Sequence, residues 1–477
     1  MINGKLSLLL LTSIFTAQVS AATIVPQNND GVDEGFNDPN PPAHANQKGN
    51  NPGTTLGELR LNVLEEAART WGDILNSNVT ITIGVTFDDL SCFANSATLG
   101  SAGSTGSVAN FSGLESDVAY HIALAESLND SNLNGGNVEI TARFNSKIDT
   151  NDPDCLGGGG FYYGLDGNAP DGTSALFPVV LHELGHGLGF ASLTNSTTRA
   201  FFGASGFPDV FSRNLHDLDT NKSWEEMSNG ERQDSALNEP ALVWQGAQVT
   251  ADRAMYLGAA PELVINAPAG IAGTFAALLG EEPTIIIPNG GVTAGVIDGN
   301  DFGDGCGLIN EASFSGKIIL FDETNSCSAA FPAFFSEFVT SSVGVIIAAT
   351  SGSGFPDMSG EISNQEITIP YVGVTEAVAD DLRDNIGSVN VTIDLSPSKL
   401  NGENQGRVKM YAPAMLEEGS SVSHWSKTAT PDLLMEPTLG MLEFADVDLT
   451  AAAFRDIGWS VNIPGEVEGL IFKDGFE

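Results

Sequence analysis

The spacing of apolar residues predicts a helix and then a strand near the beginning of the chain. Apolar residues recur at the helical period and would form one buried face: Leu59, Val63, Ala67, Trp71 and Ile74. This helix should begin after Thr55, because the Thr55 hydroxyl can cap the first turn while Glu58 reaches back to it. Strict alternation of apolar and polar residues over 79–87 then predicts a half-buried strand.

The same patterns predict further elements along the chain. A second helix is expected at about 114–128 and a second strand over 138–144, whereas the Asn-, Asp- and Pro-rich stretch from 23 to about 53 is expected to be irregular or lightly ordered. From about Thr284, short apolar runs between Gly, Asp and Ser turns predict a β-rich or α/β unit. Its strands are expected at 285–287, 318–321, 343–349, 367–374 and 389–395, with a helix at 376–386. A short helix is expected at 449–457.

The first 21 residues have the pattern of a secretory signal peptide. Lys5 precedes an apolar stretch, and Val19-Ser20-Ala21 offers small residues for cleavage. The most apolar later segment, 263–280, contains Asn266 and Pro268 and is a poor membrane span. The mature chain is therefore expected in a periplasm or outside the cell, without an integral membrane segment.

The length of the chain indicates the number of domains, and its charge limits the kinds of partner. A chain of 477 residues is expected to form two or three domains. With 19 Lys and Arg against 61 Asp and Glu, the net charge is -42, spread along the chain. Because such a surface repels phosphates, we expect no nucleic-acid partner.

The four cysteines of an exported chain favour disulfides over thiol catalysis. Four cysteines allow three pairings. Only Cys92 with Cys155 and Cys306 with Cys327 keeps each bridge within one region of the sequence, and we predict that pairing.

The candidate chemistry lies in Val-Val-Leu-His-Glu-Leu-Gly-His-Gly-Leu-Gly-Phe at 179–190. His182 and His186 are four residues apart, so on a helix both imidazoles project from one face and can share a Zn²⁺ ion. Glu183 can take a proton from a water at the metal. This spacing is typical of metalloproteases.

A catalytic zinc needs a third protein ligand, and the motif alone does not supply it. The metzincin form of the motif places a histidine where this chain has Ser192. His44, in a Pro-rich stretch, and His121, in the expected second helix, are better explained as structural. His216, Glu239 and His424 remain as candidates, and His424 has the strongest context.

That context resembles the leishmanolysin family of metzincin proteases. His424-Trp425, then Leu434-Met435-Glu436-Pro437, then a helix ending in Asp456-Ile457-Gly458-Trp459 are similar to the C-terminal part of that family. The resemblance implies that an insertion separates the third histidine from the His-Glu-x-x-His helix and places it far downstream in the sequence. It implies His424 as third zinc ligand, Met435 as the Met-turn residue beneath the zinc, and Glu183 as the base.

The insertion resembles a protease-associated domain. Asp304-Gly305-Cys306, Phe314-Ser315-Gly316-Lys317-Ile318 and Ile367-Thr368-Ile369-Pro370 carry this similarity. The two resemblances imply an α+β fold, in which a metzincin-like catalytic domain contains an inserted β-rich α/β domain. The expected segments are a signal peptide (1–21), the catalytic domain in two parts (22–245 and 399–462), the insert (246–398) and a tail (463–477).

The expected function is a secreted zinc endopeptidase acting on proteins or peptides. The chain departs from the resemblance in one respect, because no cysteine precedes Cys92 to act as a prodomain thiol switch. Asp-rich turns such as 298–304 miss the EF-hand spacing, so Ca²⁺ is unsupported. The alternatives are a non-catalytic zinc-containing binding or adhesion protein, and a metallopeptidase whose third ligand is His216 or Glu239.

Overall fold

The computed structural model describes residues 20–112, 114–203, 206–280, 287–299, 314–323, 342–350, 354–356, 369–438 and 446–462. The chain forms two compact units. The first runs to Gly189 and resumes at Ile457, and the second covers Phe190–Asp456. Both helices and strands contribute to the described residues, so the fold is mixed α and β, as predicted at that level.

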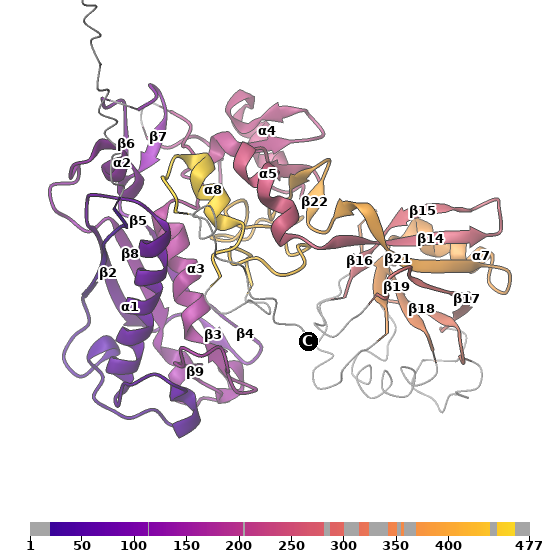
Figure 1. Cartoon of the computed structure of the whole chain (residues 1–477), viewed down its shortest axis with the longest axis horizontal. Helices are drawn as coiled ribbons and strands as arrows, with labels where there is room; N and C mark the ends of the chain where they lie inside the picture. Colours follow the sequence, from indigo (N-terminus) through magenta and orange to yellow (C-terminus); the bar gives the residue numbers. More distant parts are fainter. Residues whose placement is uncertain are drawn as a thin grey trace, which may run out of the picture. The chain divides into compact units, whose positions relative to one another are not determined.

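A four-stranded sheet organises the first unit. Its order is β1 (Ile24–Asn28), β2 (Ile81–Asp88), β8 (Ile140–Asn145) and β5 (Gly100–Ser104). The first three strands are parallel, and β5 pairs antiparallel with β8 at one edge. Helices α1 (Leu56–Ile74) and α3 (Leu176–Leu188) lie side by side and pack against this sheet (Figure 1).

The predicted helix α1 with its buried face and the predicted strand β2 are confirmed. Thr55 Oγ1 accepts the N–H of Glu58, whose carboxylate accepts from the backbone N–H of Thr55, and the five predicted apolar residues are buried. The Trp71 indole donates to the carbonyl of Leu181 and so joins α1 to α3. In β2 the side chains of Ile81, Ile83, Val85 and Phe87 are buried, and Gly84 is buried with them.

Shorter elements complete the first unit. They are η1 (Gly35–Asn37), η2 (Ala45–Lys48), β3 (Cys92–Phe93), β4 (Ser96–Ala97), β6 (Ser107–Ala109), β7 (Ala119–His121), α2 (Ile122–Asn129), η3 (Ser146–Thr150), η4 (Leu156–Gly158), β9 (Phe161–Tyr162) and β10 (Ser174–Ala175).

The last described residues close the first unit. Leu75, directly after α1, pairs with Val461, and the backbone N–H of Asn76 donates to the carbonyl of Ser460. The Trp459 indole donates to the carbonyl of Leu188, the last residue of α3. Residues 459–462 therefore hold the ends of both long helices.

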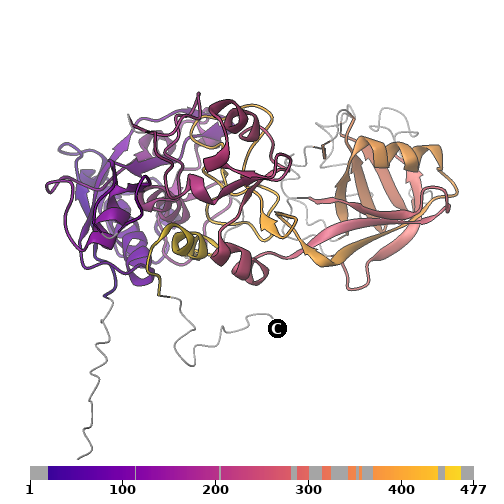
Figure 2. The same cartoon turned by 90° about the horizontal axis from the view of Figure 1, so that it is seen from above.

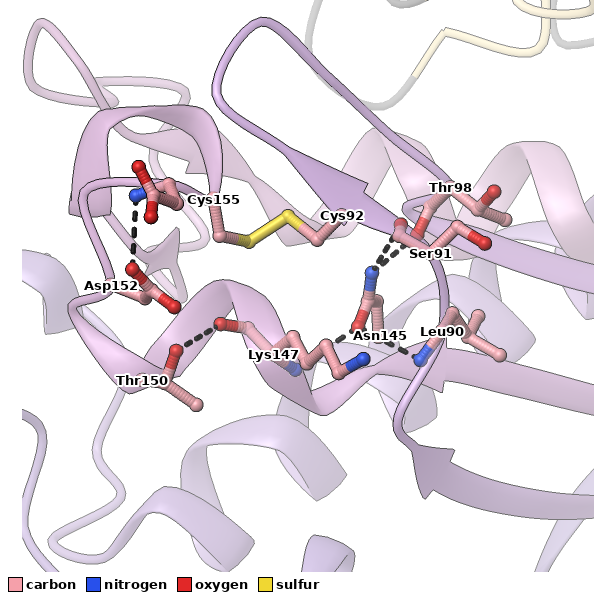
Figure 3. Close-up of a disulfide and its surroundings, with 10 residues drawn as sticks. Leu90, Ser91, Cys92, Thr98, Asn145, Lys147, Thr150, Asp152 and Cys155 are labelled. Carbon is pink, nitrogen blue, oxygen red and sulfur yellow. Dashed lines mark hydrogen bonds between the residues drawn. A yellow bond between two sulfur atoms is a disulfide. The ribbon is translucent and has the colours of Figure 1, made fainter.

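The Cys92–Cys155 disulfide is confirmed (Figure 3). It joins the β3–β4 hairpin to the segment before η4, across 63 residues of sequence. Beside it, the Asn145 side chain donates to the carbonyls of Ser91 and Thr98, which fixes both ends of the hairpin that carries Cys92. Cys306 and Cys327 lie outside the described residues, and their pairing stays a prediction.

Removing this disulfide is expected to destabilise the protein without changing its fold. Replacing Cys92 and Cys155 together by serine frees a long loop in the unfolded chain, and we expect the free energy of unfolding to fall by about 2–4 kcal/mol. Urea unfolding followed by tryptophan fluorescence measures this. An unfolding free energy equal to that of the oxidised wild type would contradict the expectation.

An eight-stranded sheet dominates the second unit. Its order is β15 (Gly273–Ala276), β14 (Ala259–Ala267), β21 (Asn390–Leu400), β17 (Val292–Asp298), β18 (Ile318–Asp322), β19 (Gly344–Ala348), β20 (Tyr371–Val374) and β16 (Leu278–Leu279). Strands β17, β18, β19 and β20 are parallel. Helix α7 (Glu376–Asp384) covers one face, and its Val378, Ala379 and Leu382 join the strand residues in one apolar core (Figure 2).

The remaining elements of the second unit are short. They are η5 (Ser212–Asn214), β11 (Leu215–Asp217), β12 (Lys222–Ser223), η6 (Trp224–Glu226), α4 (Asn229–Ser235), β13 (Leu242–Trp244), α5 (Ala247–Tyr256), β22 (Glu403–Asn404), β23 (Arg407–Val408) and α8 (Thr450–Ile457). Helix α8, which ends in the first unit at Ile457, has the predicted position.

Two expectations about local structure were wrong. Residues 24–28 form strand β1, although the stretch from 23 was expected to be irregular. Because β1 is an edge strand that buries few side chains, its sequence does not alternate between apolar and polar residues. The second helix begins only at Ile122, because residues 119–121 pair with β6. In addition, strands β14, β15 and β16 were not predicted individually, although they lie within the expected insert 246–398.

Several expectations fall outside the described residues or are not decided by them. The signal peptide lies outside them except for Ser20 and Ala21, as do residues 285 and 286 and the Asp304-Gly305-Cys306 motif. The division into a split catalytic domain and an insert stays a prediction. Within the described residues, no helix combines the length and apolar character that crossing a membrane requires.

Candidate metal centre

Helix α3 presents two imidazoles from successive turns. The Nε2 atoms of His182 and His186 are 3.1 Å apart, and the rings meet nearly edge to face. Two nitrogens that each lie about 2.0–2.1 Å from one tetrahedral zinc are separated by roughly 3.3 Å. The two Nε2 atoms therefore already have nearly the spacing of ligands that share an ion.

Close packing fixes this helix on the sheet. Leu181, Leu184 and Leu188 are buried on its other side, as predicted. A Cβ on Gly187 would lie 2.3 Å from a methyl carbon of Ile140, so only glycine permits this approach to β8. The helix ends at Leu188, and the next residue, Gly189, has a φ of 125° that suits glycine.

Glu183 is held beside these histidines by strand β5. Its carboxylate is buried and accepts the backbone N–H of Ala102. Burial raises the pKa of Glu183 to about 8, against the opposing effect of that hydrogen bond. A divalent cation nearby would lower this pKa again and favour the carboxylate form.

His424 is oriented by a hydrogen bond to its own loop. Its Nδ1 lies 2.7 Å from the carbonyl oxygen of Ser420, an acceptor, so Nδ1 carries the proton and Nε2 carries the lone pair. Such a bond to the second ring nitrogen is typical of metal-binding histidines. Next to it, the backbone N–H of Trp425 donates to the carbonyl of Met435, which is fully buried in the turn at 433–436.

An aromatic cluster surrounds the residue after His424. Trp425 packs edge to face against Phe190 and Trp244, and Phe211 contacts both Phe190 and Trp244. All four rings are buried. The conformation of the His424 segment is therefore set by the packing of large, rigid side chains.

One atom from each of His182, His186 and His424 forms a group in which all ligand atoms lie within 4.8 Å of one another. Three imidazoles at such distances can hold one metal ion, and nitrogen donors in this number suit zinc and leave a fourth position for water or substrate. The residues present thus fit a metal ion such as zinc.

The other candidate ligands are placed elsewhere. This group contains neither His216, which is buried on β11, nor Glu239, whose carboxylate accepts the hydroxyl of Ser426. His44 is an exposed residue at the start of η2, and His121 is buried at the start of α2. Ser192 is engaged in hydrogen bonds to other hydroxyl groups.

Sequence reasoning missed the backbone partners of the centre. Ala102 lies on strand β5, whose sequence Gly-Ser-Ala-Gly-Ser has no apolar alternation, so local sequence did not predict a strand there. The carbonyl of Ser420 carries no side-chain signal at all. The sequence offers only the spacing itself, since His424 follows Ser420 by four residues.

Comparisons with known proteins do not place the chain in a family. No family model matches it, and no curated protein matches it. A zinc aminopeptidase from Bacillus subtilis, BSAP, is similar in structure at 18% identity and a TM-score of 0.20, over 36% of this chain and 38% of that one. A second BSAP structure gives 16% identity and a TM-score of 0.20, over 40% and 42%.

Another similar structure is that of Apa1, a psychrophilic subtilisin-like protease from the Antarctic psychrotroph Pseudoalteromonas sp. AS-11. It is 15% identical with a TM-score of 0.22, over 34% of this chain and 36% of that one. The chain thus covers less than half the length of each of these proteins. Similarity at this level carries no functional argument.

Proposed function

We propose that this protein is an exported zinc endopeptidase of the leishmanolysin type. The observation that supports the proposal is the grouping of His182, His186 and His424 within 4.8 Å, with Glu183 on the helix that carries two of them. A metal site that served only structure would have no need of a buried carboxylate at that position.

The chain's own residues supply ligands and a proton carrier. His182, His186 and His424 would hold the ion through imidazole nitrogens. A zinc ion, when bound, supplies Lewis-acid polarisation of the scissile carbonyl and makes water more acidic. The Glu183 carboxylate takes the proton from the attacking water and then delivers it to the nitrogen of the leaving amine.

Ala102 and Gly100 position this carboxylate. The N–H of Ala102 orients Glu183, and a Cβ at Gly100 would lie 3.0 Å from Cγ and 3.2 Å from Oε1 of Glu183. Strand β5 therefore contacts the carboxylate through Ala102, and the missing side chain of Gly100 leaves room for it. Met435, buried and bonded through its carbonyl to Trp425, is the proposed Met-turn residue.

We also propose export and an accessory role for the insert. The Cys92–Cys155 disulfide supports an oxidising compartment, which the predicted signal peptide would provide. Residues 246–398 include the eight-stranded sheet, apart from the last two residues of β21, and its own apolar core. An independent core of this kind is what an inserted domain requires, and its role in contacting protein substrates is part of the proposal.

The proposal is tested on the purified mature protein. Zinc content by atomic absorption should be close to one ion per chain, and cleavage of unfolded casein should stop with a zinc chelator and return with added zinc. A protein that binds zinc but cleaves neither casein nor a peptide library would favour the binding-protein alternative.

Enlarging Gly100 is expected to impair cleavage more than zinc binding. In Gly100→Val the added methyl groups would press on Glu183 and Phe144, so we expect a loss of about tenfold or more in kcat. The over-packing should also cost about 1–3 kcal/mol of stability. Kinetics on a fluorogenic peptide and a zinc titration check this, with Gly103→Val, where the space is open, as the matched control. Equal kcat values in the two variants would contradict it.

A further inference from the structure

A buried network of hydroxyl groups lies within the second unit, in the segment that follows helix α3. Asp209 and Ser212 are buried, and the Asp209 carboxylate accepts the hydroxyl of Ser212 at 2.6 Å and its backbone N–H at 2.9 Å. It also accepts the backbone N–H of Leu193 at 3.1 Å. The Ser212 hydroxyl is 2.9 Å from that of Ser192.

The acceptor at one end sets the direction of these hydrogen bonds. Because Ser212 donates its proton to Asp209, its oxygen must accept from Ser192. The Ser192 oxygen in turn accepts the backbone N–H of Thr194 at 3.1 Å and is 2.8 Å from the Thr194 hydroxyl. Each hydroxyl therefore has one defined partner on each side, and the backbone at Ser192 is held in one conformation.

This fixed backbone reaches the segment that carries His424. The N–H of Ser192 donates to the hydroxyl oxygen of Ser423 at 3.1 Å, and Ser423 directly precedes His424. On its other side the loop is tied to Tyr411, whose N–H donates to the carbonyl of His424 and whose carbonyl accepts the N–H of Val422.

The loop needs such support because its backbone is strained. Val422 is buried and has a φ of 80°, a conformation that a β-branched residue adopts only at a cost. Strained backbone persists where the surroundings over-determine it, and it is concentrated at functional sites. Without the hydrogen bond from Ser192, the strained turn would be free to relax and turn the imidazole of His424.

We propose that Asp209, Ser212 and Ser192 are positioning residues, which act through Ser423 to hold His424 in the orientation that binds metal. The inference rests on the proposed function. It gives Ser192 a role: at the place where the metzincin motif has a ligand, this chain has an anchor for a ligand that comes from elsewhere in the sequence.

Zinc affinity tests the inference independently of catalysis. Competition with a chromogenic chelator should show that Ser423→Ala and Asp209→Asn bind zinc about 10- to 100-fold more weakly than the wild type. Ser423→Thr, which keeps the acceptor oxygen, should restore the wild-type affinity. Ser235→Ala is the matched control, since Ser235 is a buried serine of the same unit whose hydroxyl accepts the Trp224 indole N–H instead.

The outcomes separate the two proposals. If the wild type binds zinc and both variants bind within twofold of it, the positioning role is refuted while the proposed function stands. If the wild type binds no zinc, both fail. Circular dichroism verifies folding of each variant, and should Asp209→Asn not fold, Ser423→Ala, at a half-buried position, decides the question.

Discussion

Glu183→Gln is expected to lower the rate of peptide hydrolysis by a factor of about 10²–10⁴ while zinc content stays at the wild-type level. Glutamine has nearly the shape of glutamate, so the packing against β5 is kept. Its amide cannot take a proton from water, however, and the transfer to the leaving amine is lost with it. The loss should therefore appear in kcat, with KM little changed.

The comparison needs a control for the removal of any buried carboxylate. Glu126 in α2 is buried in the same unit, accepts the backbone N–H groups of Leu133 and Asn134, and lies outside the metal group. Glu126→Gln should lose stability but retain kcat. A Glu183→Gln protein that cleaved peptides at the wild-type rate would exclude Glu183 as the base.

His424→Ala is expected to abolish both stable zinc binding and cleavage. With two imidazoles left on α3, the ion would lose a third of its protein ligands, and the loss of affinity should exceed the roughly 10- to 100-fold typical of outer partners. Equilibrium dialysis against a zinc buffer measures this directly. Cleavage should remain absent at zinc concentrations that saturate the wild type.

His216→Ala and Glu239→Ala provide the contrast, because they remove the two other candidate ligands. Both residues lie outside the metal group, so each variant should keep one zinc and most of its activity. If His216→Ala or Glu239→Ala lost the metal while His424→Ala kept it, the third ligand would have been assigned wrongly and the metallopeptidase alternative would take its place.

Local patterns predicted the elements whose determinants are local. The capping box at Thr55 and Glu58 and the stripe on α1 are set within one helix, and the pair His182 and His186 needs only the helical repeat to face one point. The first disulfide was also predictable, because its cysteines belong to one region of sequence.

What escaped prediction depends on partners that are distant in sequence. Strands β1 and β5 bury few side chains, so their sequences lack the apolar alternation of a strand. They are held in the sheet by backbone hydrogen bonds, β1 to β2 and β5 to β8, which do not depend on side-chain type. No spacing rule selected His424 over His216; only the resemblance of its surroundings did. The network from Asp209 to Ser423 was likewise invisible, since four ordinary polar residues carry no pattern until the fold brings them together.

The bond from Trp459 to Leu188 has a consequence for the order in which the protein is made. Helix α3 gains this partner 271 residues after its own last residue has been synthesised, and residues 459–462 also secure the end of α1. A nascent chain that has not yet emerged to this point has an incomplete first unit and no anchored end on the helix that bears His182 and His186. Under the proposed function, the two metal-binding histidines of α3 would gain their anchored helix end only after residues 459–462 had been synthesised.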